Sequence, residues 1–523
     1  MTHLFLYGPP GSGKTTLGRA LAEALDRSFT DLDEEIEHKA GCSIREIFER
    51  HGEAAFRARE SACLKTVAEA PGERVVALGG GALLDPENRR FAEERGEVLV
   101  LNAPIEILRA RTERQAGTRP LLTGPGKDRL ADLLRQRESH YRSFPKQLDS
   151  SDDRLDEKVH RAQVLLGAFR IRGMGAPYDV RVRRGLLRDL GSWRQAVGWT
   201  GRLALVTDEH LLPLPSARTA LEALRSVGND LTLIGLPAGE ASKRLATVEM
   251  LWKGFLEGGL ERRDGVVALG GGVVSDLTGF AAATYLRGIG WGAVPTTLLA
   301  MVDASLGGKT GVDLPEGKNL IGAFHSPVWV LADPDALITL PEPVFRSGLA
   351  EVVKHGVIGD PDLFALCAQG WDAVKGSDWE ALVRRAVAVK VRVIEEDPFE
   401  KGRRAVLNLG HTLGHALEQA MDYRLDHGEA VSIGLVIEAR LAEQMGIAEK
   451  GLAARLREVL ASLGLPVAIP PSVQPAAIRT AMERDKKRVG GRVRFALPRR
   501  VGEVELGLVP DESLLDRVLG ENR

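Results

Sequence analysis

Short apolar runs alternate with amphipathic segments along the chain up to about residue 341. Runs at 4–7, 75–78 and 98–101 have the length of buried strands, and residues 15–25 carry apolar side chains at helical spacing. Further runs at 178–182, 203–206 and 266–269 repeat this pattern. Because strands that alternate with helices form parallel sheets, the pattern predicts an α/β fold in two successive units.

The pattern changes near residue 342, after which the periodicity is helical almost throughout, as at 352–357, 382–393 and 430–445. A helix predicted over 152–169 closes the first unit, and a stretch rich in glycine that ends in proline follows it. We therefore expect a domain at 1–170, a linker at 171–177, an α/β half at 178–341 and a mostly helical half at 342–523. Ligands should bind in the cleft between these two halves.

Composition excludes several classes of partner. The chain has 523 residues and a formal net charge of −2, so its overall charge favours neither nucleic acid nor an anionic membrane. Cys42, Cys63 and Cys367 are scattered without metal-binding spacing, which predicts reduced thiols. No signal-peptide pattern and no apolar run of bilayer length is present. We expect a cytoplasmic protein whose ligands are small molecules.

Residues 8–15 read GPPGSGKT, a complete phosphate-binding loop between a predicted strand and a predicted helix. The backbone N–H groups of such a loop bind phosphate oxygens at the start of the helix. Lys14 would reach the β and γ phosphates, and Thr15 would bind Mg²⁺. The predicted ATP contacts are Gly11, Ser12, Gly13, Lys14, Thr15 and Thr16. The loop alone specifies only a nucleoside triphosphate.

The substrate side of this first unit is more specific. Asp31 and Asp33 follow a second strand, and Arg57, the glycine turn at 79–81, Arg119 and Arg137 come after them. Arginine binds carboxylate in a bidentate fork, so arginines with a carboxylate suit a small hydroxylated acid. In this order the residues of 1–165 resemble shikimate kinase.

That resemblance implies that ATP phosphorylates shikimate to shikimate 3-phosphate. The residues it assigns to shikimate are Asp33, Arg57, Gly80 and Arg137. Asp33 would orient or deprotonate the attacking hydroxyl. Lys14 and Arg119, the latter on a mobile lid, would offset the charge that develops on the phosphoryl group.

The second unit carries four side chains of metal-ligand type. His411 and His415 lie one turn apart on a predicted helix, and His427 and Glu351 offer further ligands. Read by residue type alone, this set favours a catalytic zinc site with an open position. Spacing does not decide which three residues bind the metal.

Residues from about 178 to 500 resemble 3-dehydroquinate synthase. The resemblance runs through PAGEASK at 237–243, GGGVVSD at 270–276, GGKTG at 307–311 and NLGH at 408–411. It implies that Glu351, His411 and His427 hold Zn²⁺ or Co²⁺, while His415 faces the substrate. The implied NAD⁺ contacts are Asp208, Glu240, Lys243, Gly271, Gly272, Asp276, Thr296, Thr297, Lys309, Lys318 and Thr339.

The same resemblance implies a second set of residues around the substrate phosphate and hydroxyls. The implied catalytic residues are Lys309, Lys354, Arg404, Asn408 and His415, and the implied binding residues are Arg287, Asp303, Asn319 and Lys486. The choice between Lys486 and Lys487 stays open. The reaction would convert 3-deoxy-D-arabino-heptulosonate 7-phosphate to 3-dehydroquinate and phosphate, with NAD⁺ used and regenerated.

Three alternatives compete with this interpretation. A zinc- and NAD-dependent polyol dehydrogenase would keep the metal ligands but would not need so many cations. Another sugar-phosphate cyclase would use the same chemistry on a different sugar. A catalytically inactive binding module would tolerate substitutions, yet no catalytic-type position is substituted in either unit.

We therefore expect a bifunctional enzyme whose two reactions are not consecutive in their pathway. The units should work independently when the chain is split near Met174. The synthase family is often dimeric, which leaves a homodimer through the second unit open.

Overall fold

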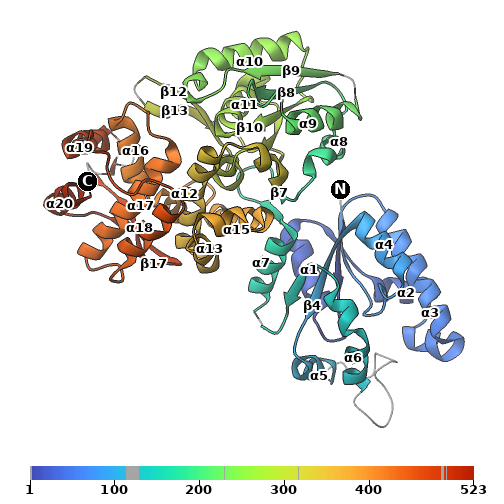
Figure 1. The fold of residues 1–523 in the computed structure, drawn as a ribbon. Helices are drawn as coiled ribbons and strands as arrows, with labels where there is room; N and C mark the ends of the chain where they lie inside the picture. The colour runs from blue at the N-terminus through green and yellow to red at the C-terminus, as the bar shows by residue number, and fades with distance from the viewer. Residues whose placement is uncertain are drawn as a thin grey trace. The chain divides into compact units, whose positions relative to one another are not determined.

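The computed structural model describes residues 3–113, 129–152, 154–228, 230–315, 317–484, 488–489 and 492–522. The chain divides into two compact units, Met1–Phe169 and Arg170–Arg523 (Figure 1). Among the described residues, no helix is both long enough and apolar enough to cross a membrane. Two predicted site residues, Arg119 and Lys486, lie outside the described ranges.

The first unit is built on a parallel sheet of five strands in the order β2-β3-β1-β4-β5. The strands are β1 (His3–Tyr7), β2 (Ser28–Asp31), β3 (Arg74–Ala77), β4 (Gly96–Asn102) and β5 (Gln147–Asp149). The helices are α1 (Lys14–Leu25), α2 (Leu32–Ala40), α3 (Ile44–Glu69), α4 (Pro86–Arg95), α5 (Ile105–Glu113), α6 (Arg129–Arg142) and α7 (Leu155–Leu166). The parallel α/β fold predicted for this unit is confirmed.

Both faces of this sheet are buried, as the side chains of β1 illustrate. Leu4 and Leu6 pack into a cluster with residues of α1 and α7. Phe5 and Tyr7 point the other way, into a cluster with residues of α2, α3 and α4. A strand that is covered on both faces reads as a continuous apolar run, which is why β1 could be recognised from sequence.

The last helix of the first unit is shorter than predicted. It ends at Leu166, because Gly167 adopts a left-handed conformation and its N–H bonds back to carbonyls of the last turn. The residues that follow form a strand, β6 (Ala168–Ile171), at the edge of the second sheet. Ile171 is fully buried.

The second unit contains a sheet of seven strands in the order β6-β7-β14-β11-β10-β8-β9. Its other strands are β7 (Tyr178–Val182), β8 (Leu203–Asp208), β9 (Leu231–Leu236), β10 (Gly265–Gly270), β11 (Gly290–Pro295) and β14 (Trp329–Ala332). From β7 to β9 the neighbours pair in parallel. Helices α8 (Leu190–Ala196), α9 (Pro215–Arg225), α10 (Leu245–Glu257) and α11 (Gly272–Thr284) accompany it. Strands β12 (Lys309–Leu314) and β13 (Gly317–Phe324) form a separate antiparallel hairpin in the same unit.

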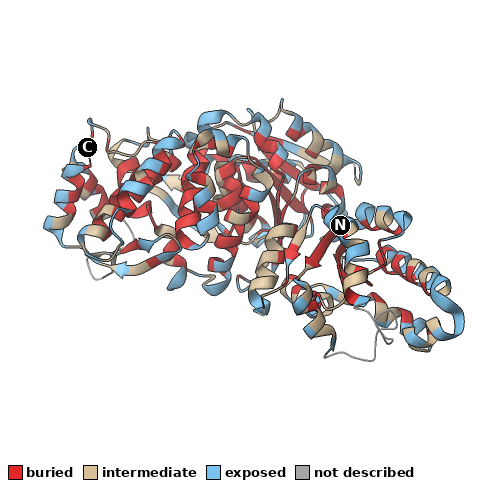
Figure 2. Cartoon of the chain, turned by 60° about the horizontal axis from the view of Figure 1, so that its bottom comes forward, coloured by how far each residue is buried: buried red, intermediate tan, exposed pale blue. Residues whose placement is uncertain are grey.

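The rest of the second unit is mostly helical, as predicted. Its helices are α12 (Glu342–Gly359), α13 (Pro361–Cys367), α14 (Trp371–Lys375), α15 (Trp379–Glu396), α16 (His411–Ala420), α17 (His427–Gln444), α18 (Leu452–Ser462), α19 (Pro475–Arg484) and α20 (Glu512–Glu521). Buried residues, red in Figure 2, concentrate on the strands and on the inner faces of many helices, whereas α12 and α17 are buried along most of their length.

Short strands interrupt this helical part. The pairs are β15 (Arg488–Val489) with β16 (Arg492–Val493), and β17 (Phe495–Arg500) with β18 (Glu503–Leu508). The second hairpin was not predicted. Its signal is present in the alternation of Phe495 and Leu497 and in Gly502, whose φ of 92° suits a tight turn.

The position of β6 generates a prediction about fragments. A second-unit fragment that begins at residue 175 lacks β6, whereas one that begins at residue 168 keeps it. Burial of a side chain such as Ile171 contributes about 1.5–3 kcal/mol, so the longer fragment should have the higher melting temperature. Circular dichroism melts of the two purified fragments measure this difference. Equal melting temperatures would show that the edge strand contributes nothing.

Candidate active sites

The phosphate-binding loop of the first unit joins β1 to α1. Gly11 and Gly13 have φ values of 79° and 87°, which glycine adopts without strain. Lys14 begins α1, and its Nζ donates to the carbonyl oxygens of Gly8 and Pro9 at 2.9 and 3.1 Å. The Thr15 hydroxyl donates to Asp31 Oδ2 at 2.7 Å. A hydroxyl beside a carboxylate, at the ends of parallel strands, is a suitable pair of ligands for Mg²⁺.

The glycine turn at 79–81 gathers the residues predicted to bind the substrate of this unit. Arg137 and Tyr141 both donate to the Gly80 carbonyl oxygen, at 3.0 and 2.7 Å. A Cβ placed on Gly79 would lie 3.1 Å from Asp33 Oδ1, and one placed on Gly81 would lie 2.7 Å from Arg57 Nη2. Asp33, Arg57, Gly80 and Arg137 therefore surround one turn.

Glu60 belongs to the same group and was missed from sequence. It is buried, and its Oε2 lies 2.6 Å from Arg57 Nη1. Burial raises the pKa of this carboxyl, although Arg57 opposes the shift. Its spacing of one helical turn from Arg57 was the available signal.

The second unit contains a cavity of about 1470 Å³ between its α/β half and its helical half. Most of the residues predicted from sequence line it. They are Asp208, Glu240, Lys243, Gly271, Gly272, Asp276, Thr296, Thr297, Asp303, Lys309, Lys318, Asn319, Thr339, Lys354, Arg404, Asn408, His411, His415 and His427. Glu351 is fully buried beside the cavity, whereas Arg287 is exposed and does not line it.

One wall of the cavity is suited to a dinucleotide. Strand β10 ends at Gly270 and α11 begins at Gly272, so backbone N–H groups at a helix start face the cavity. Lys243 Nζ contacts Asp276 Oδ2 at 2.5 Å and Asn319 Oδ1 at 2.6 Å. The buried Thr296 hydroxyl has no hydrogen-bond partner among the described residues. A phosphate-containing ligand fits this donor set.

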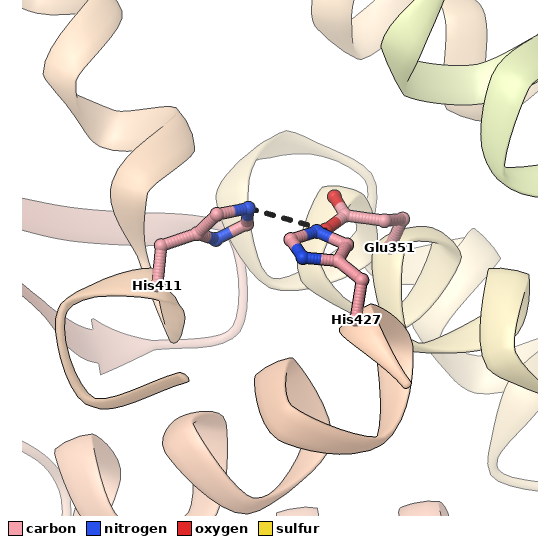
Figure 3. Close-up of side chains that lie close together, drawn as sticks. All are labelled: Glu351, His411 and His427. Carbon is pink, nitrogen blue, oxygen red and sulfur yellow. Dashed lines mark ion pairs between the residues drawn. The ribbon is translucent and has the colours of Figure 1, made fainter. Parts of the chain in front are cut away.

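Three helices bring Glu351, His411 and His427 close together (Figure 3). Glu351 comes from α12, while His411 and His427 are the first residues of α16 and α17. The Nε2 atoms of both histidines lie 3.4 Å from Glu351 Oε1. One ligand atom from each residue falls within 4.8 Å of the others. Two imidazoles and a carboxylate fit Zn²⁺ or a similar cation.

His415 lies in a different group of ligand type, with Glu418 and His427. The residue pair suggested by helical spacing alone, His411 with His415, is thus divided between two groups. Both groups contain His427, whose Nε2 faces Glu351 in the first group and whose Nδ1 faces Glu418 in the second.

Strong electrostatic coupling accompanies the triad. Burial raises the pKa of Glu351, but Lys354 and His411 outweigh this and hold it well below its usual range. Burial lowers the pKa of His427, yet Glu351 and Glu418 raise it overall to about 9. His355, next to this cluster, is held neutral because burial and Lys354 lower its pKa to about 3.

Lys390 and Glu400 are cavity residues that sequence reasoning missed. Lys390 Nζ donates to Asp303 Oδ1 at 2.6 Å, and burial lowers its pKa to about 8. Glu400 forms an ion pair with Lys309 and accepts a hydrogen bond from Asn408 Nδ2 at 3.0 Å. No pattern distinguished Lys390, because its helix also carries arginines at 384, 385 and 392.

The triad depends on unusually close packing of α17. A Cβ on Gly428 would clash with the Ser347 carbonyl oxygen of α12, and a Cβ on Gly434 would clash with the Gly410 carbonyl oxygen just before α16. The buried Glu438 of α17 accepts hydrogen bonds from the N–H groups of Gly410 and Leu413, at 2.6 and 3.3 Å. Helix α17 therefore both packs against α16 and caps its start.

Comparison with known proteins gives the family. Residues 233–347 match the N-terminal family model of 3-dehydroquinate synthase, and residues 348–488 match its C-terminal model. A 3-dehydroquinate synthase of Symbiobacterium thermophilum is 46% identical over 344 residues, which cover 64% of this chain and 94% of that protein. The chain belongs to the 3-dehydroquinate synthase family.

The first unit belongs to a second family, because residues 10–165 match the model of shikimate kinase. A solved shikimate kinase from Acinetobacter baumannii, in complex with shikimate, is 39% identical. The match covers 32% of this chain and 93% of that one, with a TM-score of 0.30. The match of residues 10–165 to the family model places the first unit in the shikimate kinase family.

The synthase unit also resembles a related cyclase structure. The 2-epi-5-epi-valiolone synthase ValA from Streptomyces hygroscopicus subsp. jinggangensis, with NAD⁺ and Zn²⁺ bound, is 30% identical with a TM-score of 0.61. The match covers 66% of this chain and 96% of that one.

The packing of α17 generates a prediction. Gly434→Ala should destabilise the chain by about 1–3 kcal/mol, because the new methyl group forces α17 away from the backbone before α16. Gly520→Ala in α20 is the matched control, since nothing lies within 4 Å of its Cβ position. Urea unfolding of the two variants measures the difference. Equal stabilities would mean that α17 can move aside without cost.

Proposed function

We propose that the chain is a bifunctional enzyme of the shikimate pathway. Its first unit phosphorylates shikimate with ATP, and its second converts 3-deoxy-D-arabino-heptulosonate 7-phosphate to 3-dehydroquinate and phosphate. The observation that carries the second assignment is one cavity that combines a metal-type triad, a glycine turn suited to NAD⁺ and several cations.

In the synthase unit, Glu351, His411 and His427 would hold Zn²⁺ or Co²⁺. The bound cation would lower the pKa of a substrate hydroxyl and polarise the carbonyl derived from it. The residues of the β10–α11 turn would hold NAD⁺, which would supply a reversible oxidation of that hydroxyl. The resulting ketone would make the neighbouring C–H acidic so that phosphate would leave, and NAD⁺ would be regenerated in each turnover.

The cations of this chain would bind and orient the leaving phosphate. Lys354 and Lys390 meet at Asp303, with Nζ to Oδ1 distances of 3.8 and 2.6 Å. Arg404 lies in the same cavity and donates to the Gly307 carbonyl oxygen at 3.2 Å. Cations held in place before substrate arrives stabilise a developing anion without reorganisation.

Three predicted substrate groups would act beside these cations. Lys309 and Asn408 are paired with Glu400, so an anionic substrate group would compete with that carboxylate for them. His415 faces the cavity and would contact substrate.

In the kinase unit, Asp33 would accept the proton of the attacking hydroxyl or orient it. Arg57 and Arg137 would bind the shikimate carboxylate in forks. Lys14 would offset charge on the transferred phosphoryl group, and Thr15 with Asp31 would hold Mg²⁺. The role of Arg119 stays a prediction.

The alternatives fit less well. A polyol dehydrogenase has no phosphate to expel, so Lys354, Lys390 and Arg404 would have no task. Another sugar-phosphate cyclase is disfavoured, because identity is 46% to a 3-dehydroquinate synthase and 30% to the valiolone synthase. The attached shikimate kinase domain belongs to the same pathway as dehydroquinate. An inactive module is disfavoured because Lys14 and the whole triad are present.

The discriminating experiment is phosphate release from the heptulosonate phosphate, with Zn²⁺ present and NAD⁺ far below the substrate concentration. Many phosphates should be released per NAD⁺ with no net absorbance of NADH, because the hydride returns to the product. Accumulation of NADH in step with turnover would indicate a dehydrogenase instead.

Paired variants test whether the two activities are separate. Lys14→Met should lower shikimate kinase activity by at least about 100-fold, because a charge that stabilises the transition state is lost, and it should leave phosphate release unchanged. Lys354→Met should instead lower phosphate release by the synthase unit and leave shikimate kinase activity unchanged. Each variant is the control for the other. Loss of both activities in either variant would contradict independent sites.

A further inference from the structure

Glu418 is a buried acidic residue that none of the steps above uses. It lies on α16, seven residues after His411, and is 1% exposed. Its Oε2 lies 3.7 Å from His427 Nδ1, and its Oε1 accepts a hydrogen bond from Lys318 Nζ at 3.0 Å. Each oxygen of Glu418 therefore faces a basic side chain, His427 on one side and Lys318 on the other.

The geometry around His427 assigns a distinct role to each of its ring nitrogens. Nε2 faces Glu351 Oε1 at 3.4 Å, and Nδ1 faces Glu418. A neutral imidazole that offers Nε2 to a cation carries its proton on Nδ1, and a carboxylate opposite Nδ1 holds the ring in that form. His411 reaches the same arrangement differently, since its Nδ1 lies 3.1 Å from the Leu409 carbonyl oxygen.

Glu418 could instead be a ligand, because it forms a group with His415 and His427. The two arrangements make opposite demands on His427, which would bind through Nε2 in one and through Nδ1 in the other. One observation favours the first, because Glu351 Oε1 lies 3.4 Å from the Nε2 atoms of both His411 and His427.

Lys318 extends the contact across the cavity. It comes from β13 in the α/β half, and its Nζ also lies 3.3 Å from Glu240 Oε1. Glu240 lies in the short helix η3 (Glu240–Ser242), on the wall predicted to bind the dinucleotide. A line of alternating charges, Glu240–Lys318–Glu418, thus leads from that wall to His427.

We propose that Glu418 is the positioning residue for His427, and that its ion pair with Lys318 ties the metal ligand to the dinucleotide side of the cavity. The proposal rests on the metal site of the proposed function. Glu418 does not touch the cation. It fixes the orientation and proton of a ligand that does, and it holds that ligand against the other half of the unit.

Zn²⁺ affinity of the full chain, measured by competition with a chelator, tests the proposal. Glu418→Gln should bind Zn²⁺ about 10–100-fold more weakly than the unaltered chain, because amides orient a histidine less well than carboxylates do. Glu458→Gln, the same change at an exposed site on α18, is the matched control and should bind normally. Glu351→Gln and His427→Ala provide the references for loss of a ligand.

The visible absorption of Co²⁺ bound to each variant separates positioning from ligation. Glu418→Gln should keep the band pattern of the unaltered chain at saturating Co²⁺, whereas Glu351→Gln should change it. Unchanged Zn²⁺ affinity in Glu418→Gln would overturn the proposal. A band pattern altered as in Glu351→Gln would also overturn it and make Glu418 a ligand.

Lys318→Met tests the same link without altering Glu418, and it covers the case in which Glu418→Gln fails to fold. We expect a several-fold loss of Zn²⁺ affinity, and unchanged affinity would overturn the coupling. If the unaltered chain binds no divalent cation, the proposed metal site itself fails, which is distinct from failure at Glu418 alone.

Discussion

Helix α17 lies directly against the backbone of both α12 and α16, and the metal-type triad depends on that packing. Gly428 and Gly434 remove the side chains that would hold the helices apart. Glu438 then bonds to the N–H groups at the start of α16, which is where His411 sits. Because Glu351, His411 and His427 come from three helices, no single helix could have placed them. The glycines are therefore part of the site, although they present no chemistry of their own.

The buried charges follow from the same arrangement. Removing an ion from water costs several kcal/mol, so a cavity that holds Lys354, Lys390, Asp303 and Glu351 gains little stability from them. Each charge is offset by an opposite neighbour, and the pKa shifts reflect that mutual pairing. Clusters of this kind are typical of sites that must bind or transfer charge. We interpret the cluster as a prepared environment for an anionic substrate.

The fold was predictable from sequence where the signal was local. The strands of both sheets are covered on two faces and read as apolar runs, and the phosphate loop is a continuous motif. The α/β class and the helical second half are confirmed. The predicted end of α7 was wrong because Gly167 stops the helix. The next four residues join a sheet whose other strands come later in the chain. The β17–β18 hairpin was missed because its short alternation lay within a region of helical periodicity.

The sites divide in the same way. Most of the predicted cavity residues came from family resemblance, although residue type alone indicated a metal site, and their individual roles stay predictions. Lys390, Glu400 and Glu418 could not be selected from sequence, because each matters only through a partner from another element. Helical spacing favoured His411 with His415 as strongly as any other pair. The contact that distinguishes His427 from His415, the approach of its Nε2 to Glu351, is a property of tertiary packing.

The phosphate sites that we propose in the two units differ physically, which is why the kinase site was recognised from a local motif and the synthase site was not. The kinase loop binds phosphate mainly through backbone N–H groups of consecutive residues, so the motif forms wherever a strand meets a helix in this way. In the synthase cavity the cations that we propose for phosphate binding are side chains from β12, α12, α15 and the segment before α16. Their charges repel one another and converge only when acids such as Asp303 and Glu400 hold them. Such a cluster of cations forms only in the folded unit, whereas the phosphate-binding loop can be recognised from eight consecutive residues of the sequence.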